Sequence, residues 1–224
     1  MKKFISGLFI IITINACQIN CMAQTISYVA LGDSYTIGTG ANEEQAWPVL
    51  LTQHLKRNKV NIELVANPSV NGRTTQGLIE YSLPILDASK PTFVTLLIGT
   101  NDWVIGMDAV TFQQNLIYII EHVQKQLPDK SKLVLLTLPD FSLTPSGANY
   151  GKGRDISKGL SEFNKIISSE ALKRKLKIVD LFELSQEVKT NPDLISDDGL
   201  HPSAKGYAVW EKHIYEVVYP LLVK

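Results

Sequence analysis

Three side chains that together could perform nucleophilic catalysis stand far apart in this chain. Ser34 ends a Gly-Asp-Ser tripeptide after an apolar run, whereas Asp198 and His201 lie near the other end, in an Asp-Gly-Leu-His-Pro turn. A carboxylate that holds one imidazole nitrogen fixes the tautomer and stabilises the imidazolium, so the other nitrogen can act as a general base for a serine. The residue types therefore indicate acyl-serine chemistry, although each segment alone is also typical of an ordinary turn.

Two further segments could supply hydrogen-bond donors to an oxyanion. Asn101 lies in a Gly-Thr-Asn-Asp segment after an apolar run, and its amide can donate a hydrogen bond without adding charge. Gly72 ends a loop over residues 67–72, where the lack of a Cβ lets a backbone N–H approach a reacting centre. Each segment alone is weak evidence for an oxyanion site. Together with Ser34 and the Asp-His pair, the two segments indicate one.

We expect three residues that adjoin the candidate segments to have no direct part in proton transfer or nucleophilic attack. Asp33 should bind backbone N–H groups around the serine turn, because Asx side chains favour such local hydrogen bonds. Asp197 adjoins the candidate acid but is expected to be a solvated turn residue. Trp103 could line a substrate pocket, although a single aromatic side chain is at least as typical of packing.

Other kinds of site lack their sequence signatures. The glycines at positions 38 and 40 are not followed by a Lys-Ser/Thr pair or by a third glycine, so phosphate-loop and dinucleotide motifs are absent. His54, His122 and His213 have no second histidine or carboxylate at a zinc-binding spacing. We therefore expect no metal site.

The apolar pattern predicts the elements that would bring the candidate residues together. Five short apolar runs separated by longer segments are typical of parallel strands buried on both faces. These runs cover residues 26–31, 62–66, 93–98, 133–138 and 177–181. Helical spacing of apolar residues is clearest over residues 110–127, 161–176 and 203–222.

This alternation predicts one α/β domain, a three-layer α/β/α sandwich with a flavodoxin-like five-stranded parallel sheet. Ser34, Gly72 and Asn101 each follow a predicted strand, so they should meet at the carboxyl edge, where such sheets bind ligands. An irregular stretch over residues 140–155 follows the fourth strand, so it should lie at the same edge. Such a long loop is either a functional flap or disordered.

The N-terminal segment has the order of an export signal. Lys2 and Lys3 precede an apolar run over residues 4–14, and small residues follow. This run is shorter than the roughly 20 apolar residues that a spanning helix needs. We expect cleavage after Ala23, so that residues 1–23 form a signal peptide and residues 24–224 form a periplasmic or secreted domain without a spanning segment.

An alternative processing route involves a cysteine. Residues 14–17 loosely resemble a lipobox, in which Cys17 would carry a lipid anchor. Both cysteines, Cys17 and Cys21, precede the favoured cleavage site. The predicted mature domain therefore has no disulfide, no cysteine nucleophile and no cysteine-bound zinc.

Composition and charge narrow the class of partner. The chain has 224 residues, of which 45% are apolar and 20% are charged, enough for a single domain with a core of its own. Its 22 basic residues balance its 22 acidic residues. A nucleic-acid-binding protein needs a basic excess to neutralise phosphates, so we expect no nucleic-acid partner.

The four candidate segments, in this order, resemble the sequence blocks of the SGNH (GDSL-type) hydrolase family. The first block matches residues 31–35 and would make Ser34 the nucleophile. The second resembles residues 67–75, with Gly72 as the oxyanion glycine, and the third matches residues 99–102, with Asn101 as the oxyanion amide. The last block, Asp-x-x-His, matches Asp198 and His201.

The resemblance implies an esterase that needs neither a metal ion nor an organic cofactor. His201 would accept the Ser34 proton, and oxyanion charge would be received by the N–H groups of Ser34 and Gly72 and by the Asn101 amide. The implied substrates are lipid, aryl or acetylated-sugar esters, as in lysophospholipases, arylesterases and carbohydrate esterases. A non-catalytic envelope binding module and an acyltransferase remain as alternatives, and the oligomeric state has no signal in the sequence.

Overall fold

The computed structural model describes residues 24–223, which contain a sheet of five parallel strands in the order β2-β1-β3-β4-β5. The strands are β1 (Ile26–Gly32), β2 (Ile62–Ala66), β3 (Phe93–Leu97), β4 (Leu133–Leu136) and β5 (Lys177–Val179). Each begins where the apolar runs predicted it and ends within two residues of the expected place. The predicted export segment, with Cys17, Cys21 and Ala23, lies outside the described residues.

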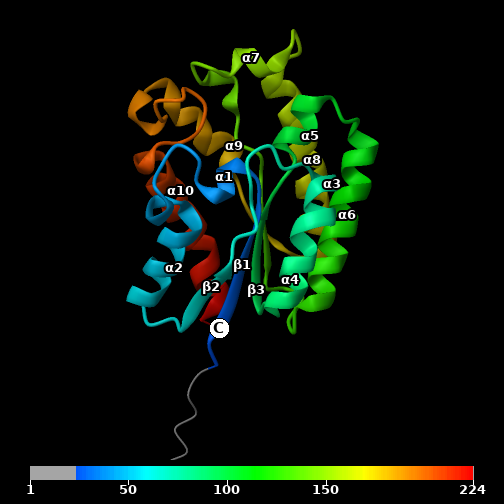
Figure 1. Ribbon diagram of the computed structural model, residues 1–224, viewed down its shortest axis with the longest axis vertical. Coiled ribbons are helices and arrows are strands. Elements are labelled where there is room, and N and C mark those ends of the chain that lie inside the picture. Colours follow the sequence, from blue (N-terminus) through cyan, green and yellow to red (C-terminus); the bar gives the residue numbers. More distant parts are fainter. Residues whose placement is uncertain (1–23, 224) are drawn as a thin grey trace, which may run out of the picture.

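Helices cover both faces of the sheet (Figure 1). On one face lie α2 (Trp47–Arg57) and α10 (Ala204–Leu222), and on the other lie α4 (Leu83–Ser89), α6 (Ala109–Gln126) and α8 (Ile156–Arg174). The predicted three-layer α/β/α architecture is thereby confirmed. Helix α8 begins five residues before the predicted start, because the Asp155 side chain caps it by accepting a hydrogen bond from the Lys158 N–H at 3.0 Å.

Short helical segments fill the connections at the carboxyl edge and near it. They are α1 (Ser34–Ile37), Glu43–Gln45, α3 (Thr75–Gly77), Leu78–Ser82, α5 (Thr100–Ile105), Phe141–Leu143, α7 (Ala148–Gly151), α9 (Leu181–Leu184), Ser185–Lys189 and Pro192–Leu194. The stretch over residues 140–155, expected to be irregular, is folded into two of these short turns at the carboxyl edge (Figure 1). No helix of residues 24–223 combines the length and the apolar character needed to cross a bilayer.

The core explains why the central strands carry the site. All five residues of β3 are buried, and the Tyr28 hydroxyl of β1 meets the Thr95 hydroxyl of β3 at 2.8 Å, so a buried polar pair is satisfied between adjacent strands. Phe112 of α6 stacks on Phe163 of α8 with ring centroids 4.2 Å apart. These contacts hold the strand ends, and therefore the loops that leave them, in fixed relative positions.

One side chain of α8 holds the chain as it leaves β4. The Asn164 Oδ1 accepts a hydrogen bond from the Leu138 N–H at 2.7 Å, and the Asn164 Nδ2 donates to the Leu138 carbonyl at 2.9 Å. Both residues are buried, so the amide replaces the neighbouring strand that the backbone of Leu138 lacks.

Replacing Asn164 with Ala should therefore destabilise the protein. The change leaves a buried N–H and a buried carbonyl of Leu138 without partners, and each such group costs roughly 1–3 kcal/mol. We expect the free energy of unfolding, measured by urea titration, to fall by about 3 kcal/mol. The exposed neighbour substitution Lys165→Ala should change it by less than about 0.5 kcal/mol, and equal effects of the two variants would contradict the assigned role of Asn164.

Candidate active site

The candidate nucleophile lies where β1 passes into α1. Asp33 caps this short helix, since its Oδ1 accepts a hydrogen bond from the Tyr35 N–H at 3.0 Å, as expected for an Asx side chain at a turn. Gly32 is required here, because a Cβ at this position would lie 2.1 Å from the Thr36 Oγ1. The resulting sharp turn presents Ser34, the first residue of α1, at the carboxyl edge of the sheet, where the end of β1 pairs with the end of β3.

A continuous set of hydrogen bonds joins the two ends of the chain. The Ser34 Oγ lies 2.9 Å from the His201 Nε2, and the His201 Nδ1 lies 2.6 Å from the Asp198 Oδ2. The turn that carries both residues is closed by an antiparallel bridge between Ile195 and Pro202. The structure thus brings together the three residues that the sequence singled out.

The environment of Asp198 keeps its carboxylate ionised. Partial burial acts to raise the pKa, but hydrogen bonds from the His201 ring, from the backbone N–H groups of His201 and Leu200, and from the Ser196 hydroxyl lower the pKa to about 2. An ionised Asp198 accepts the hydrogen on Nδ1 of His201, which leaves Nε2 as the acceptor that faces Ser34.

Two backbone N–H groups near Ser34 are available to a ligand. Within residues 24–223, neither the Ser34 N–H nor the Gly72 N–H has a hydrogen-bond acceptor. Gly72 has a φ of +76°, a left-handed conformation that favours glycine, and a Cβ there would meet no atom within 4 Å. The glycine therefore serves the turn rather than a tight contact.

The side chain of Asn101 lies beside this pair and is already engaged. Its Nδ2 donates to the Asp33 Oδ2 at 3.2 Å and to the Arg73 carbonyl at 3.1 Å. Both distances are at the long end for N–H···O hydrogen bonds. The contact with Asp33 was not anticipated from the sequence, because it joins the ends of two adjacent strands.

Two buried carboxyl groups lie behind the site. Burial raises the pKa of Asp33 to about 7, and the nearby charge of Asp102 adds to this effect, while hydrogen bonds from Tyr35 and Asn101 oppose it. Burial also raises the pKa of Asp102, against hydrogen bonds from the backbone and hydroxyl of Thr75. The two carboxyl groups therefore differ sharply from the ionised Asp198 at the surface of the same site.

A cleft with a volume of about 280 Å³ opens beside Ser34 and His201. Its polar lining includes Ser34, Gly72, Asn101 and His201. The apolar walls, by contrast, were not singled out from the sequence. They are formed by Tyr35, Val104, Phe141, Tyr150 and Leu200.

Of the two interpretations of Trp103, a packing residue and a pocket residue, the packing residue agrees with its position. Trp103 is only 6% exposed, lies outside the cleft lining, and packs beneath the Arg154 guanidinium, 4.1 Å from its ring centroid. Successive residues of a helix point about 100° apart. On α5, the next residue, Val104, therefore lines the cleft, together with Thr100 and Asn101.

The segment over residues 146–154 bridges two walls of the cleft, and we call it the strap. At its start, the Ser146 N–H donates to the Gly199 carbonyl at 2.8 Å, within the turn that carries the candidate acid. At its end, the Arg154 Nη1 donates to the Trp103 carbonyl of α5 at 2.7 Å. Tyr150, between the two attachments, lines the cleft. Of the two interpretations of this stretch, a flap at the site agrees with its position.

Two of the other three histidines, His54 and His122, are paired with carboxylates, and His213 is exposed. His54 is paired with Glu211 at 2.8 Å, and His122 is paired with Asp87 at the same distance. Asp197 is exposed, as expected. Across residues 24–223, no three or more His, Cys, Asp or Glu side chains are grouped so that they could hold a metal ion.

Comparison with known proteins gives consistent matches over most of the chain. The sequence profile of the GDSL-like Lipase/Acylhydrolase family matches residues 30–209. Esterase TesA of Pseudomonas aeruginosa is 27% identical over 200 residues, covering 89% of this chain and 90% of that protein. Thioesterase 1/protease 1/lysophospholipase L1 of Escherichia coli is 28% identical, covering 81% and 77%, respectively. A crystal structure of TesA superposes with a TM-score of 0.70 at 26% identity, over 88% of this chain and 99% of that one.

The buried carboxyl of Asp33 should make stability depend on pH. Its pKa is higher in the folded than in the unfolded chain, so the folded protein retains a proton that the unfolded chain has lost. The free energy of unfolding of the wild type should therefore fall, relative to Asp33→Asn, as pH rises from about 4 to about 7. A pKa near 7 in place of 3.8 corresponds to a decline on the order of 4 kcal/mol.

Urea titrations of both proteins across this pH range would measure the effect. The exposed Asp197→Asn variant serves as the control and should follow the wild type. If the curves of the wild type and Asp33→Asn ran parallel from pH 4 to pH 7, Asp33 would not hold the proton assigned to it.

Proposed function

The chain belongs to the GDSL-like lipase/acylhydrolase family, and on that premise we propose that it hydrolyses carboxylic esters through Ser34, His201 and Asp198. The observation that supports this mechanism most directly is the unbroken series of hydrogen bonds from Asp198 through His201 to the Ser34 Oγ. The two distances and the ionised carboxylate of Asp198 are what general-base activation of a serine requires.

In the acylation step, the Ser34 Oγ attacks the ester carbonyl while the His201 Nε2 accepts the hydroxyl proton. Asp198 stays ionised and stabilises the imidazolium that forms, because its pKa lies far below neutral pH. The imidazolium then gives its proton to the departing alkoxide, so the alcohol leaves neutral. Water then attacks the acyl carbonyl from the same face while the His201 Nε2 takes its proton, and His201 returns that proton to the Ser34 Oγ as the bond to the acyl carbon breaks and the acid leaves.

Negative charge on the tetrahedral intermediate would be received by three donors. Among residues 24–223, the Ser34 and Gly72 N–H groups have no acceptor, and the Asn101 amide would redirect one of its long hydrogen bonds from Asp33 or Arg73. The two backbone donors are fixed in place before the reaction, so they need no reorganisation when charge develops.

The walls of the cleft favour an ester with an apolar acyl group. Val104, Phe141 and Tyr150 provide apolar surface beside the nucleophile. The family relatives are named as an esterase and as a thioesterase and lysophospholipase, which agrees with activity on oxygen esters or thioesters of such acids. We propose this substrate class for the protein.

The serine should be indispensable for this activity. The change Ser34→Ala removes the nucleophile, and we expect kcat/KM for p-nitrophenyl butyrate to fall on the order of 10⁴-fold or more. A fluorophosphonate probe should label the wild type at Ser34, which also distinguishes an enzyme from a binding module. Ser168→Ala, an exposed serine on α8, should leave both readouts unchanged.

The released acid should be quantified alongside the released nitrophenol. Equal amounts indicate hydrolysis, whereas a deficit of acid in the presence of a sugar alcohol indicates acyl transfer. Retention of wild-type activity by Ser34→Ala would refute the proposed mechanism.

We also propose that residues 1–23 direct export and are removed after Ala23. The support is the sequence order of Lys2 and Lys3, an apolar run and small residues. The protein recovered from the cell envelope or medium should therefore begin at Gln24, as read by intact-mass spectrometry. A mass that corresponds to a lipidated N-terminal Cys17 would support the anchored alternative and reject cleavage after Ala23.

A further inference from the structure

The segment over residues 38–40, which follows α1, has no part in the mechanism above but adjoins several of its components. Its sequence is Gly-Thr-Gly. A Cβ on Gly40 would lie 2.6 Å from the Ser196 Oγ and 2.7 Å from the Pro202 carbonyl oxygen. Because only glycine allows so close an approach, the segment packs directly on the turn that carries Asp198 and His201.

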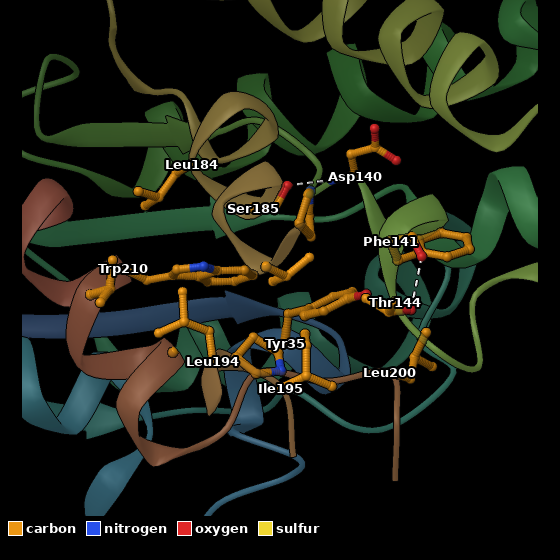
Figure 2. Close-up of a pocket in the computed structure, with 15 residues that line it drawn as sticks. Tyr35, Asp140, Phe141, Thr144, Leu184, Ser185, Leu194, Ile195, Leu200 and Trp210 are labelled. Atoms are coloured by element: carbon orange, nitrogen blue, oxygen red, sulfur yellow. Dashed lines mark hydrogen bonds between the residues drawn. The ribbon is translucent and has the colours of Figure 1, made fainter. Parts of the chain in front are cut away.

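Apolar packing holds α1, just before this segment, in the same way. The Tyr35 ring lies 5.7 Å from that of Trp210 of α10, centroid to centroid. Tyr35 also lines a small cavity together with Leu194 and Ile195, which lead into the Asp198 turn (Figure 2). The cavity has only about 20 Å³ of free space, roughly the room of one water-sized sphere. The chain that follows β1 is therefore tightly packed against the turn that carries Asp198.

Thr39, between the two glycines, forms hydrogen bonds with three separate parts of the molecule. Its N–H donates to the Ser34 carbonyl at 3.0 Å, and its carbonyl accepts a hydrogen bond from the Tyr207 hydroxyl of α10 at 2.8 Å. Its Oγ1 donates to the Asn71 Oδ1 at 2.6 Å. The two backbone hydrogen bonds fix Thr39 relative to the nucleophile turn and to α10, so its hydroxyl can hold Asn71 from a fixed position.

The loop that carries Gly72 is anchored at both of its ends. At its start, the Asn67 Nδ2 donates to the Thr36 carbonyl at 3.1 Å. At its end, the Arg73 carbonyl accepts a hydrogen bond from the Asn101 Nδ2 at 3.1 Å. These contacts leave the middle of the loop to be held by other means.

The middle of this loop, residues 70–72, has little packing of its own. All three residues are exposed, and a Cβ on Gly72 would meet no atom within 4 Å. Within residues 24–223, the hydrogen bond between Thr39 and Asn71 is the only one that joins residues 70–72 to a segment outside their loop. The position of Gly72 therefore depends on this one contact.

We propose that Thr39 is a positioning residue which, through Asn71, fixes the Gly72 N–H relative to the Ser34 N–H. The two backbone donors come from different segments, and they can act on one oxyanion only if their relative position is set before charge develops. Thr39 is bonded both to Ser34 and to the residue directly before Gly72. This inference rests on the proposed ester hydrolysis and adds a residue that serves the reaction without touching a reacting atom.

Removing the Thr39 hydroxyl should slow the reaction without weakening substrate binding. Thr39→Val keeps the branched shape of the side chain and both backbone hydrogen bonds but releases Asn71. Loss of an oxyanion donor costs about 10²–10³ in kcat, and a displaced donor should cost less, so we expect kcat for p-nitrophenyl butyrate to fall about tenfold. KM should stay at the wild-type value, because the oxyanion forms only on the way to the transition state. Rates are expressed per site titrated with a fluorophosphonate, so a smaller folded fraction cannot imitate the fall.

Further variants separate positioning from a general structural effect. Thr39→Ser retains the hydroxyl and should restore the wild-type kcat. Asn71→Ala, at an exposed position, should lower kcat as Thr39→Val does, and the double variant should fall no further, because both changes break the same hydrogen bond. Thr190→Val removes another exposed hydroxyl, which donates to the Glu187 carbonyl away from the cleft, and should leave kcat unchanged.

The outcomes distinguish this inference from the proposed function. A wild-type kcat in Thr39→Val or Asn71→Ala, additive losses in the double variant, or failure of Thr39→Ser to restore activity would each overturn the role of Thr39 while leaving ester hydrolysis standing. An altered pH dependence of kcat/KM in Thr39→Val would also overturn it, since that result would locate the effect at His201. Absence of any Ser34-dependent hydrolysis by the wild type would overturn the proposed function and this inference together.

Discussion

The contact of 2.9 Å between the Ser34 Oγ and the His201 Nε2 is the constraint on which the rest of the site depends. The two residues come from opposite ends of the chain, so the whole fold must close before they can meet. Helix α10 secures the closure: Trp210 packs against Tyr35, and the Tyr207 hydroxyl donates to the Thr39 carbonyl at 2.8 Å. The turn that carries Asp198 and His201 is thereby held against the segment that follows β1.

Two aspartates of the site illustrate how environment assigns different states to one residue type. Asp198 has several hydrogen-bond donors and partial access to water, and its pKa is about 2. Asp33 is fully buried, and its pKa is about 7. The first supplies a stable negative charge next to His201. The second limits the negative charge beside the donors that would receive an oxyanion, where such a charge would be unfavourable.

The strap is attached to the turn that carries Asp198 and His201. It lies in the chain after β4, and the Ser146 N–H donates to the Gly199 carbonyl of that turn. The cleft wall that contains Tyr150 is therefore linked by a backbone hydrogen bond to the turn that carries Asp198 and His201. Ser34 is thus positioned by the end of β1, whereas Asp198 and His201 lie on a turn that α10 holds against the segment after β1.

The amino-acid sequence alone was sufficient for the sheet and for the residues that could react. Continuous apolar runs have a local periodicity that marks buried strands, and the residues at strand ends must then share one edge. Two features could not be obtained in this way. One is the contact between Asn101 and Asp33, and the other is that Trp103 is buried whereas Val104 lines the cleft. They depend on which side chains from distant segments pack together, and only the tertiary structure decides that, because packing is set by the shapes and volumes of all neighbours at once.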